Sequence, residues 1–301
     1  MTNGLDIGIT IPDSTSIDGV VKSVRAAADR GFHSAWMAQI FGIDTLTALA
    51  IAGREVPDIT IGSAVIPTYP RHPMMLAAQA PTVQQASNGR FVLGIGLSHQ
   101  IVIEGMLGIP WKQHTTHVRD YLAILGPLCA GEPVSHEGAT LTAKVTLDIP
   151  LQSSPPVPVL VAALGPNLLA LAGSMADGTI TWMTGPDTIR KHVVPLITAA
   201  AAEAGRPSPQ VVMSLPVTVT DDVDDARAQA AKLFSIYGFL PSYRAMLDRE
   251  GVGGPGDVAI VGTEDEVRTQ IEAVFDAGAT TFTAAVFGNA DRTQDLLASL
   301  L

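Results

Sequence analysis

The chain has 301 residues, of which 47% are hydrophobic and 16% are charged, so it is long and apolar enough to bury a large core. A formal net charge of -11 argues against a protein that binds nucleic acid through a basic surface. The single cysteine, Cys129, excludes an internal disulfide framework, and residues 1–10 lack the basic and apolar regions of a signal peptide. No stretch is apolar for long enough to span a bilayer, so we expect a cytoplasmic protein that does not bind membranes.

Short apolar runs typical of buried strands alternate with helical patterns along the chain. The expected strands are 5–11, 34–38, 58–66, 90–97, 157–164, 178–183, 211–220 and 280–287. The expected helices are 16–31, 44–55, 73–89, 117–131, 167–178, 186–205, 224–239 and a helix at the C-terminus. About eight strand and helix units in one domain, 1–301, predict an α/β fold, the (β/α)8 TIM barrel. A doubly wound open sheet is the alternative, although no Gly-x-Gly-x-x-Gly pattern follows the first strand.

The fourth expected strand is followed by an unusually long connection to the fifth. Its part 132–156 is rich in Pro, Ser and Thr, and we expect an inserted hairpin and loop there. In a barrel, the loops after the strands converge on one end of the ring, so candidate functional residues are sought in those loops.

The fourth strand ends in two glycines and then becomes polar. Gly94 and Gly96 lack the third glycine of a dinucleotide fingerprint, because position 99 is His. The glycines allow either a neighbouring strand or a ligand to approach closely, and the sequence leaves both possibilities open. Ser98 and His99 could donate hydrogen bonds to the carbonyls of a heterocycle, and a histidine titrates near neutral pH.

The fifth strand runs into a turn with the features of an anion site. Its residues are Ala162, Ala163, Leu164, Gly165, Pro166 and Asn167. A glycine ends the strand, a proline stands at the first helical turn, and an apolar helix follows. The free N–H groups and the dipole of such a helix suit a phosphate without any basic side chain. An ordinary turn between a strand and a helix is the alternative.

Two further features carry weaker signals. Residues 62–64 place Gly, Ser and Ala in the middle of the third strand, which indicates a bulge or the close approach of a flat ligand. His114 and His117 are three residues apart, but no carboxylate motif accompanies them. We therefore expect solvated histidines at a helix start rather than a metal pair, and no metal site.

Six stretches, taken in order, resemble the luciferase-like monooxygenase superfamily and, within it, the branch that uses coenzyme F420, a deazaflavin. These stretches are 31–39, 61–79, 89–110, 118–138, 157–186 and 261–267. The resemblance implies the same barrel with an insertion after strand four. It also implies a cis peptide bond between Ser63 and Ala64, and a homodimer formed through the side of helices 44–55 and 73–88.

For the site, the resemblance implies that Ser63 and Ala64 support the face of the tricyclic ring. It assigns the coenzyme phosphate to the loop 162–167, and it places Gly96, Ser98 and His99 beside the edge of the ring or its side chain. These residues and Gln39 are the expected cofactor-binding residues, and His99 is the expected catalytic residue.

The chain departs from the sugar-phosphate dehydrogenases of this branch, which carry an Asp-His pair after strand two and a Glu after strand four. Gln39, Ile40 and His99 stand at those positions, so we do not expect that substrate class. We expect a reductase that passes a hydride from the coenzyme to a small organic acceptor, with a proton from solvent or His99. An FMN-dependent monooxygenase of the same superfamily and a non-catalytic flavin-binding or deazaflavin-binding protein are the alternatives.

Overall fold

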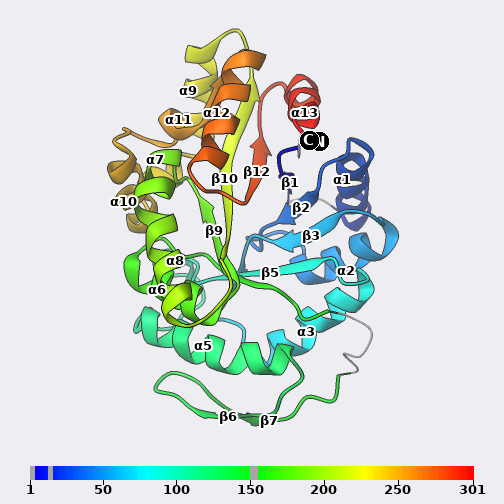
Figure 1. The fold of residues 1–301 in the computed structure, drawn as a ribbon, viewed down its shortest axis with the longest axis vertical. Helices are drawn as coiled ribbons and strands as arrows, with labels where there is room; N and C mark the ends of the chain where they lie inside the picture. Colours follow the sequence, from blue (N-terminus) through cyan, green and yellow to red (C-terminus); the bar gives the residue numbers. More distant parts are fainter. Residues whose placement is uncertain (1–3, 13–15, 150–154) are drawn as a thin grey trace.

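The computed structural model describes residues 4–12, 16–149 and 155–301, and within them eight parallel strands form a closed ring (Figure 1). In ring order these are β1 (Ile7–Ile11), β2 (Ser34–Met37), β3 (Thr60–Ser63), β5 (Phe91–Gly96), β8 (Val159–Val161), β9 (Gly178–Trp182), β10 (Gln210–Val219) and β12 (Thr281–Val286). Pairing of β1 with β12 and of β9 with β10 closes the ring. The barrel prediction is therefore confirmed, and the open-sheet alternative is wrong.

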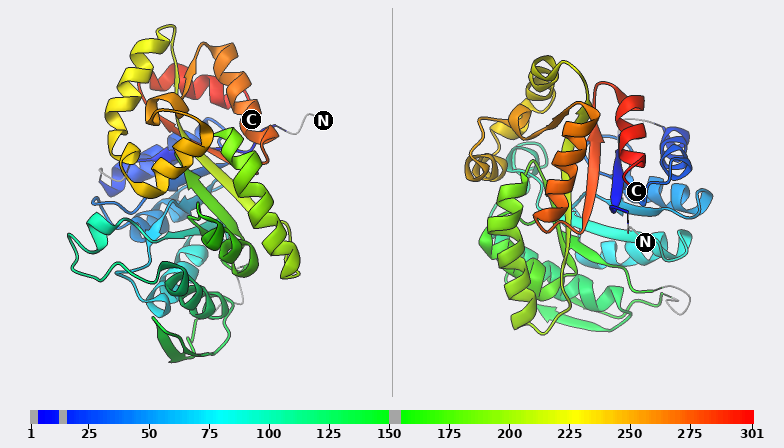
Figure 2. Two further views of the ribbon diagram at one scale, coloured as in Figure 1. Left: turned by 90° about the vertical axis from the view of Figure 1, so that its left-hand side faces the viewer. Right: turned by 45° about the horizontal axis from the view of Figure 1, so that its top comes forward.

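Helices surround the ring of strands (Figure 2). Up to the fifth strand of the ring they are α1 (Ile17–Asp29), α2 (Thr45–Glu55), α3 (Pro73–Ala86), α4 (Gln100–Ile103) and α5 (His114–Cys129). After it come α6 (Pro166–Met175), α7 (Pro186–Thr188), the π-helix η1 (Ile189–Val193), α8 (Val194–Glu203), α9 (Val223–Leu233) and the 3-10 helix η2 (Ser235–Gly238). The last are α10 (Pro241–Glu250), α11 (Pro255–Val258), α12 (Glu264–Asp276) and α13 (Ala290–Ala298). Across the described ranges, no helix is long and apolar enough to cross a membrane.

Local signals in the sequence specify the start and the buried face of α1. The hydroxyl oxygen of Ser16 accepts a hydrogen bond from the N–H of Gly19 at 3.1 Å, which satisfies one of the free donors at the start of the helix. Val20 and Val24, four residues apart, are fully buried, so one face of the helix packs on the barrel.

The insertion after the fourth ring strand contains the expected hairpin. It is formed by β6 (Val134–Glu137) and β7 (Thr142–Val145), which pair antiparallel; residues 150–154 of the predicted segment lie outside the described ranges. Asp120 of α5 holds the turn, because its carboxylate accepts hydrogen bonds from Thr140 N at 2.8 Å and Thr140 Oγ1 at 2.7 Å. The hairpin is thereby attached to the helix that covers the barrel.

The connection between β10 and β12 is also long, and its secondary structure differs from the prediction. The helix expected over 224–239 ends at Leu233, and η2, α10, α11, β11 (Ile260–Gly262) and α12 come before β12. β11 pairs with the end of β10, outside the ring. The helix prediction fails after Leu233 because the aromatic residues that follow pack against the end of the barrel and not along a helix face.

Trp36 fills the inside of the barrel and explains the glycine at position 62. A Cβ atom at Gly62 would overlap its ring, whereas one at Gly8 would overlap Ser34 Oγ. The indole N–H donates a hydrogen bond to Ser34 Oγ at 2.8 Å. The small residue at position 62 therefore makes room for Trp36, which accounts for this glycine.

The third strand contains the bulge that the small residues predicted. Gly62 is opposite Val92, but Ile66 is opposite Ile95, so β3 and the short β4 (Ile66–Pro67) carry one residue more than β5 over this interval. The cis peptide bond lies in the bulge between Ala64 and Val65, one bond later than expected. The small residues predicted the bulge, but its register against β5 is set by pairing between strands and could not be read from them.

Candidate functional site

The carboxyl ends of the ring strands carry a small apolar surface, which we call the mouth floor (Ala64, Val65, Gly96 and Ala162). A Cβ atom at Gly96 would lie 2.7 Å from Val65 Cγ2 and 3.1 Å from Ala162 Cβ, so the glycine lies between these two side chains. Ala64, Val65 and Ala162 are half-buried, which leaves part of each side chain accessible. The mouth floor offers methyl groups and backbone, and no charge, to a ligand.

The loop 162–167 leads from this floor into α6. Ala162 N donates to Ile95 O at 2.8 Å, and Leu164 O accepts a hydrogen bond from His192 Nε2 at 2.8 Å, which fixes the course of the loop. Gly165 is the N-cap of α6 and no side chain caps the helix, while a Cβ atom at Gly165 would meet nothing within 4 Å. Because the first N–H groups of a helix have no partner inside it, α6 presents free donors beside the mouth floor.

His99 follows the fourth ring strand and lies close to α10. Ser98 has a left-handed backbone, with φ at 67°, and His99 is the N-cap residue of α4. The imidazole ring centre lies 5.6 Å from that of Tyr243. Burial lowers the pKa of His99 below its ordinary value of 6.5, so the ring is neutral at pH 7 and carries one N–H donor.

Aromatic side chains from three elements form a row at the mouth. Tyr243 of α10 meets Tyr237 of η2 at 5.1 Å between ring centres, and Tyr237 meets Trp182 at the end of β9 at 5.7 Å. Phe234 also packs against Trp182, with 5.6 Å between ring centres. The left view of Figure 2 shows the segments that follow β5 and β10 on the same side of the barrel, consistent with the contact between His99 and Tyr243. We call Trp182, Phe234, Tyr237 and Tyr243 the aromatic row.

A second helix start at the mouth is occupied by a carboxylate of the protein itself. Glu250, at the end of α10, accepts hydrogen bonds from Asp187 N at 3.1 Å and Thr188 N at 2.7 Å. These are the first amides of the run formed by α7, η1 and α8, which begins after β9. A Cβ atom at Gly185 would overlap the carboxyl group, so glycine is needed there to admit Glu250.

Three of the predicted site residues have side chains that the fold itself uses. Gln39 Oε1 accepts a hydrogen bond from Thr45 N at 2.9 Å and so caps α2. Ser63 is fully buried, and its hydroxyl group donates to Gly94 O and accepts from Gly94 N, both at 2.9 Å. Ala163 is also fully buried. The mouth therefore brings together Ala64, Gly96, Ala162, Gly165 and His99, while the side chains of Gln39, Ser63 and Ala163 hold the scaffold.

His117 is buried, so the prediction of two solvated histidines is wrong. Its ring stacks on Tyr69 with centres 4.1 Å apart and an angle of 3° between the planes, and its Nε2 lies 3.0 Å from Thr68 Oγ1. Burial lowers the pKa of His117 to about 4, with His114 adding to the effect and Asp120 opposing it. The histidine is thus a neutral support for the loop after β4. Over the described ranges, no group of three or more His, Cys, Asp or Glu side chains could hold a metal ion.

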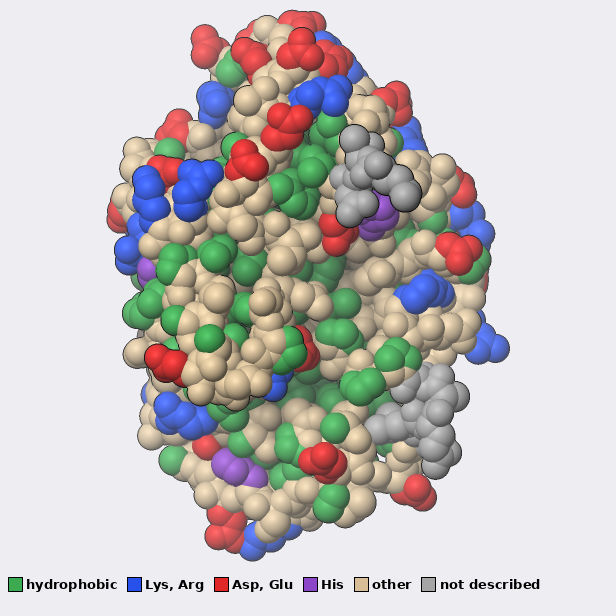
Figure 3. Space-filling view, in the orientation of Figure 1, with side chains coloured by type: hydrophobic (Ala, Val, Ile, Leu, Met, Phe, Trp, Pro, Cys, Tyr) green, Lys and Arg blue, Asp and Glu red, His purple; other side chains and the backbone are tan. Residues whose placement is uncertain are grey.

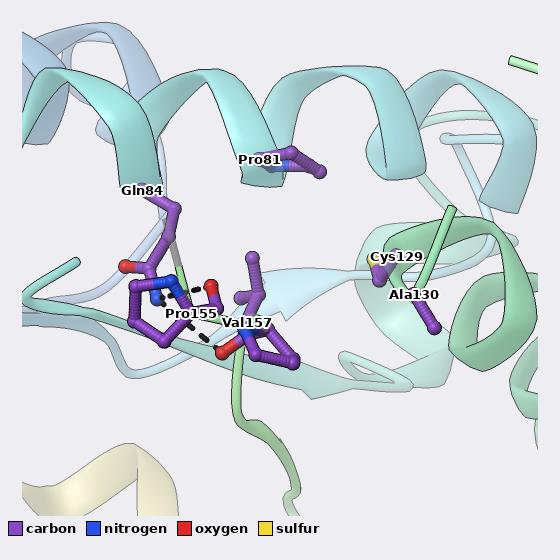
Figure 4. A pocket seen from close by; sticks show the side chains of 7 residues that line it. Pro81, Gln84, Cys129, Ala130, Pro155 and Val157 are labelled. Carbon is purple, nitrogen blue, oxygen red and sulfur yellow. Dashed lines mark hydrogen bonds between the residues drawn. The ribbon is translucent and has the colours of Figure 1, made fainter. Parts of the chain in front are cut away.

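The pockets at the opposite end of the barrel are lined by residues that we do not expect to bind a cofactor or to react. One of about 200 Å³ lies between α3, the end of α5 and the segment before β8 (Figure 4). Gln84 crosses its wall and donates to the carbonyl oxygens of Pro155 and Pro156 at 3.3 and 3.4 Å. Burial raises the pKa of the Cys129 thiol to about 12, so the cysteine lining this pocket stays protonated and unreactive.

The sequence analysis missed the residues that reach the mouth from the connection between β10 and β12. Tyr237, Tyr243 and Glu250 lie in a segment without a strong apolar period, and their positions depend on packing against β9 and α7. Pro241 at the first turn of α10 was a usable signal for a helix start. His192 was likewise assigned only to a helix, and its bond to Leu164 could not be read from the sequence.

The closed barrel, its mouth floor and the open start of α6 define a (β/α)8 protein built to bind a ligand at the carboxyl ends of its strands. Residues 5–281 match the family model described as luciferase-like monooxygenase, and the chain belongs to that family. The family resemblance inferred from the sequence is confirmed.

Two curated relatives share much of the chain. The 5,10-methylenetetrahydromethanopterin reductase of Methanolobus tindarius is 25% identical over 312 residues, which cover 93% of this chain and 94% of the relative. The F420-dependent glucose-6-phosphate dehydrogenase of Beutenbergia cavernae is 32% identical over 190 residues, 61% of this chain and 55% of the relative. Relatives with F420 in their names agree with the branch inferred from the sequence.

Solved structures show the same fold. The coenzyme F420-dependent tetrahydromethanopterin reductase of Methanopyrus kandleri superposes with a TM-score of 0.82 at 21% identity, over 99% of this chain and 98% of that chain. The oxygenating constituent of 3,6-diketocamphane monooxygenase of Pseudomonas putida, solved with FMN, has a TM-score of 0.76 at 20% identity over the same shares of the two chains. Barrels of this shape therefore include proteins described with F420 and with FMN.

Proposed function

We propose that this protein is an F420-dependent oxidoreductase that acts as a reductase, passing a hydride from the reduced coenzyme to a small organic acceptor. The names of the sequence relatives support the coenzyme. The observation that carries the proposal is the uncapped start of α6 beside an uncharged, methyl-lined floor. A molecule that is flat and apolar at one end and anionic at the other fits this pair of features.

The residues present fit the coenzyme. Ala64, Val65, Gly96 and Ala162 would support one face of a flat ring, and the free N–H groups of Asn167 and Leu168 would receive a phosphate at the start of α6. When bound, a deazaflavin supplies a carbon centre that transfers hydride and handles oxygen poorly.

His99 is the side chain we propose to hold a proton at the site. Burial keeps its pKa below 6.5, so at neutral pH the ring offers an N–H donor to an acceptor carbonyl and carries no charge. It lies between the end of β5 and Tyr243, where it would help to exclude water. The indole N–H of Trp182 is buried without a partner among the described residues, which leaves one further donor unmatched at this end of the barrel.

The variant Gly165→Ala tests the proposal. Gly165 has φ at -81° and open space around its Cβ position, so alanine fits the fold but places a methyl group where the phosphate would lie. We expect the Kd for F420, followed by quenching of its fluorescence, to rise at least tenfold, about 1.4 kcal/mol. Gly126→Ala, on α5 with equally open space, is the matched control and should bind F420 as the wild type does. An unchanged Kd in Gly165→Ala would remove the phosphate assignment.

An FMN-dependent monooxygenase remains the second candidate, favoured by the likeness to the FMN-bound structure. The same titration with FMN separates the two functions. Tight binding of FMN without binding of F420, together with oxygen consumption that depends on reduced FMN, would replace our proposal.

We also propose that the protein works in the cytoplasm, as a homodimer, without nucleic-acid or membrane partners. Acidic side chains gather over the end formed by α9 and α12, and they accompany a net charge of -11 (Figure 3). α2 and α3 are rich in small residues, and Met75 on α3 is 53% exposed. Such a face suits burial against a second copy of the chain. Light scattering after gel filtration should give a dimer mass, and a monomer at all concentrations would contradict this.

A further inference from the structure

Glu250 places a carboxylate at the mouth beside the end of β9. Its carboxylate is bound by two backbone N–H groups at the start of the helical run 186–203, where partial positive charge favours an anion. The protein has thus filled with its own carboxylate a position that could have received a phosphate or carboxylate of a ligand. A second anion at this place would meet the like charge of Glu250 and find both amides taken.

The helix that carries Glu250 also carries part of the aromatic row. Tyr243 lies seven residues before Glu250 on α10, hence on the same face of the helix, and belongs to this row, which reaches His99 at one end and Phe234 at the other. Burial raises the pKa of Tyr243 well above its ordinary value, so its hydroxyl group stays uncharged.

The loops that follow β2, β5 and β10 extend the same apolar character outward. They carry seven of the ten exposed large hydrophobic side chains of the described residues, namely Ile40, Phe41, Ile101, Met106, Leu107, Ile236 and Phe239. Exposed apolar side chains that gather around one site mark it as a place where apolar surface is buried by a ligand.

We infer that the substrate of this mouth is an uncharged, predominantly apolar organic molecule that contacts the aromatic row, and that Glu250 is a specificity-determining residue that rejects anionic substrates. This inference rests on the proposed function, since it names the class of acceptor for that site. Substrate selection here works by repulsion of the wrong class as well as by contact with the right one.

The test compares two probes that share an aromatic body and differ in charge, 2-naphthol and 2-naphthyl phosphate. Their binding is measured by calorimetry with saturating F420 present, so that the start of α6 is occupied. We expect the wild type to prefer 2-naphthol at least tenfold. In Glu250→Gln, which keeps the size of the side chain and one acceptor, we expect this preference to fall at least threefold. Asp248→Asn removes the same charge from an exposed position of α10 that faces Arg244, and it should keep the wild-type preference.

The outcomes separate this inference from the proposed function. Equal or tighter binding of the phosphate by the wild type, no binding of 2-naphthol, or an unchanged preference in Glu250→Gln would each overturn the inference. If Glu250→Gln does not fold, judged by its circular dichroism, Glu250→Asp takes its place, because the shorter carboxylate withdraws from the amides. Failure of F420 to bind would count against the proposed function alone, and the same probe comparison on the coenzyme-free protein would still decide the charge preference.

Discussion

Replacement of His117 by glutamine should remove a defined part of the acid sensitivity of the fold. His117 is 5% exposed, and burial lowers its pKa from 6.5 to about 4. Because the folded pKa lies below the unfolded value, the stabilisation is complete above pH 6.5 and is lost as the pH falls toward 4. The full difference corresponds to about 3 kcal/mol, of which about 2 kcal/mol is already lost at pH 5.

The assay is urea unfolding at pH 7.5 and pH 5.0. Between these values the free energy of unfolding of the wild type should fall by about 2 kcal/mol more than that of His117→Gln, since the variant has no imidazole to protonate. His33→Gln, which removes a half-exposed imidazole, controls for the loss of a histidine as such. Equal losses in the wild type and His117→Gln would refute the reasoning and show that the stacked ring can take up a proton without cost.

Two further predictions concern the scaffold. Gly94→Ala should lower the free energy of unfolding by about 2 kcal/mol, because its Cβ atom would overlap the carbonyl oxygen of Ser63, and thermal unfolding against Gly126→Ala as control should show the loss. Cys129 should not react with a thiol reagent such as DTNB at pH 8 in the folded protein, because burial raises its pKa to about 12, and it should react fully in guanidinium; fast labelling of the native protein would contradict its burial.

The sequence predicted those parts of the fold that depend on local pattern. The ring strands were found because parallel strands covered on both faces are apolar throughout, and the turn at 162–167 was found because glycine and proline mark the start of α6. The burial of His117 could not be predicted, since its partner Thr68 lies 49 residues away. The course of 234–262 was missed for the same reason: its aromatic side chains are placed by contacts with Trp182.

The indole that fills the barrel has a consequence for how this sequence can vary. Because the ring of Trp36 occupies the space that a Cβ atom at Gly62 would need, these two positions can change only together. Homologues with a smaller residue at position 36 are free to carry alanine or larger at position 62, whereas those that keep tryptophan should keep the glycine. An alignment of the family would then show positions 36 and 62 as a covarying pair within an otherwise variable barrel interior.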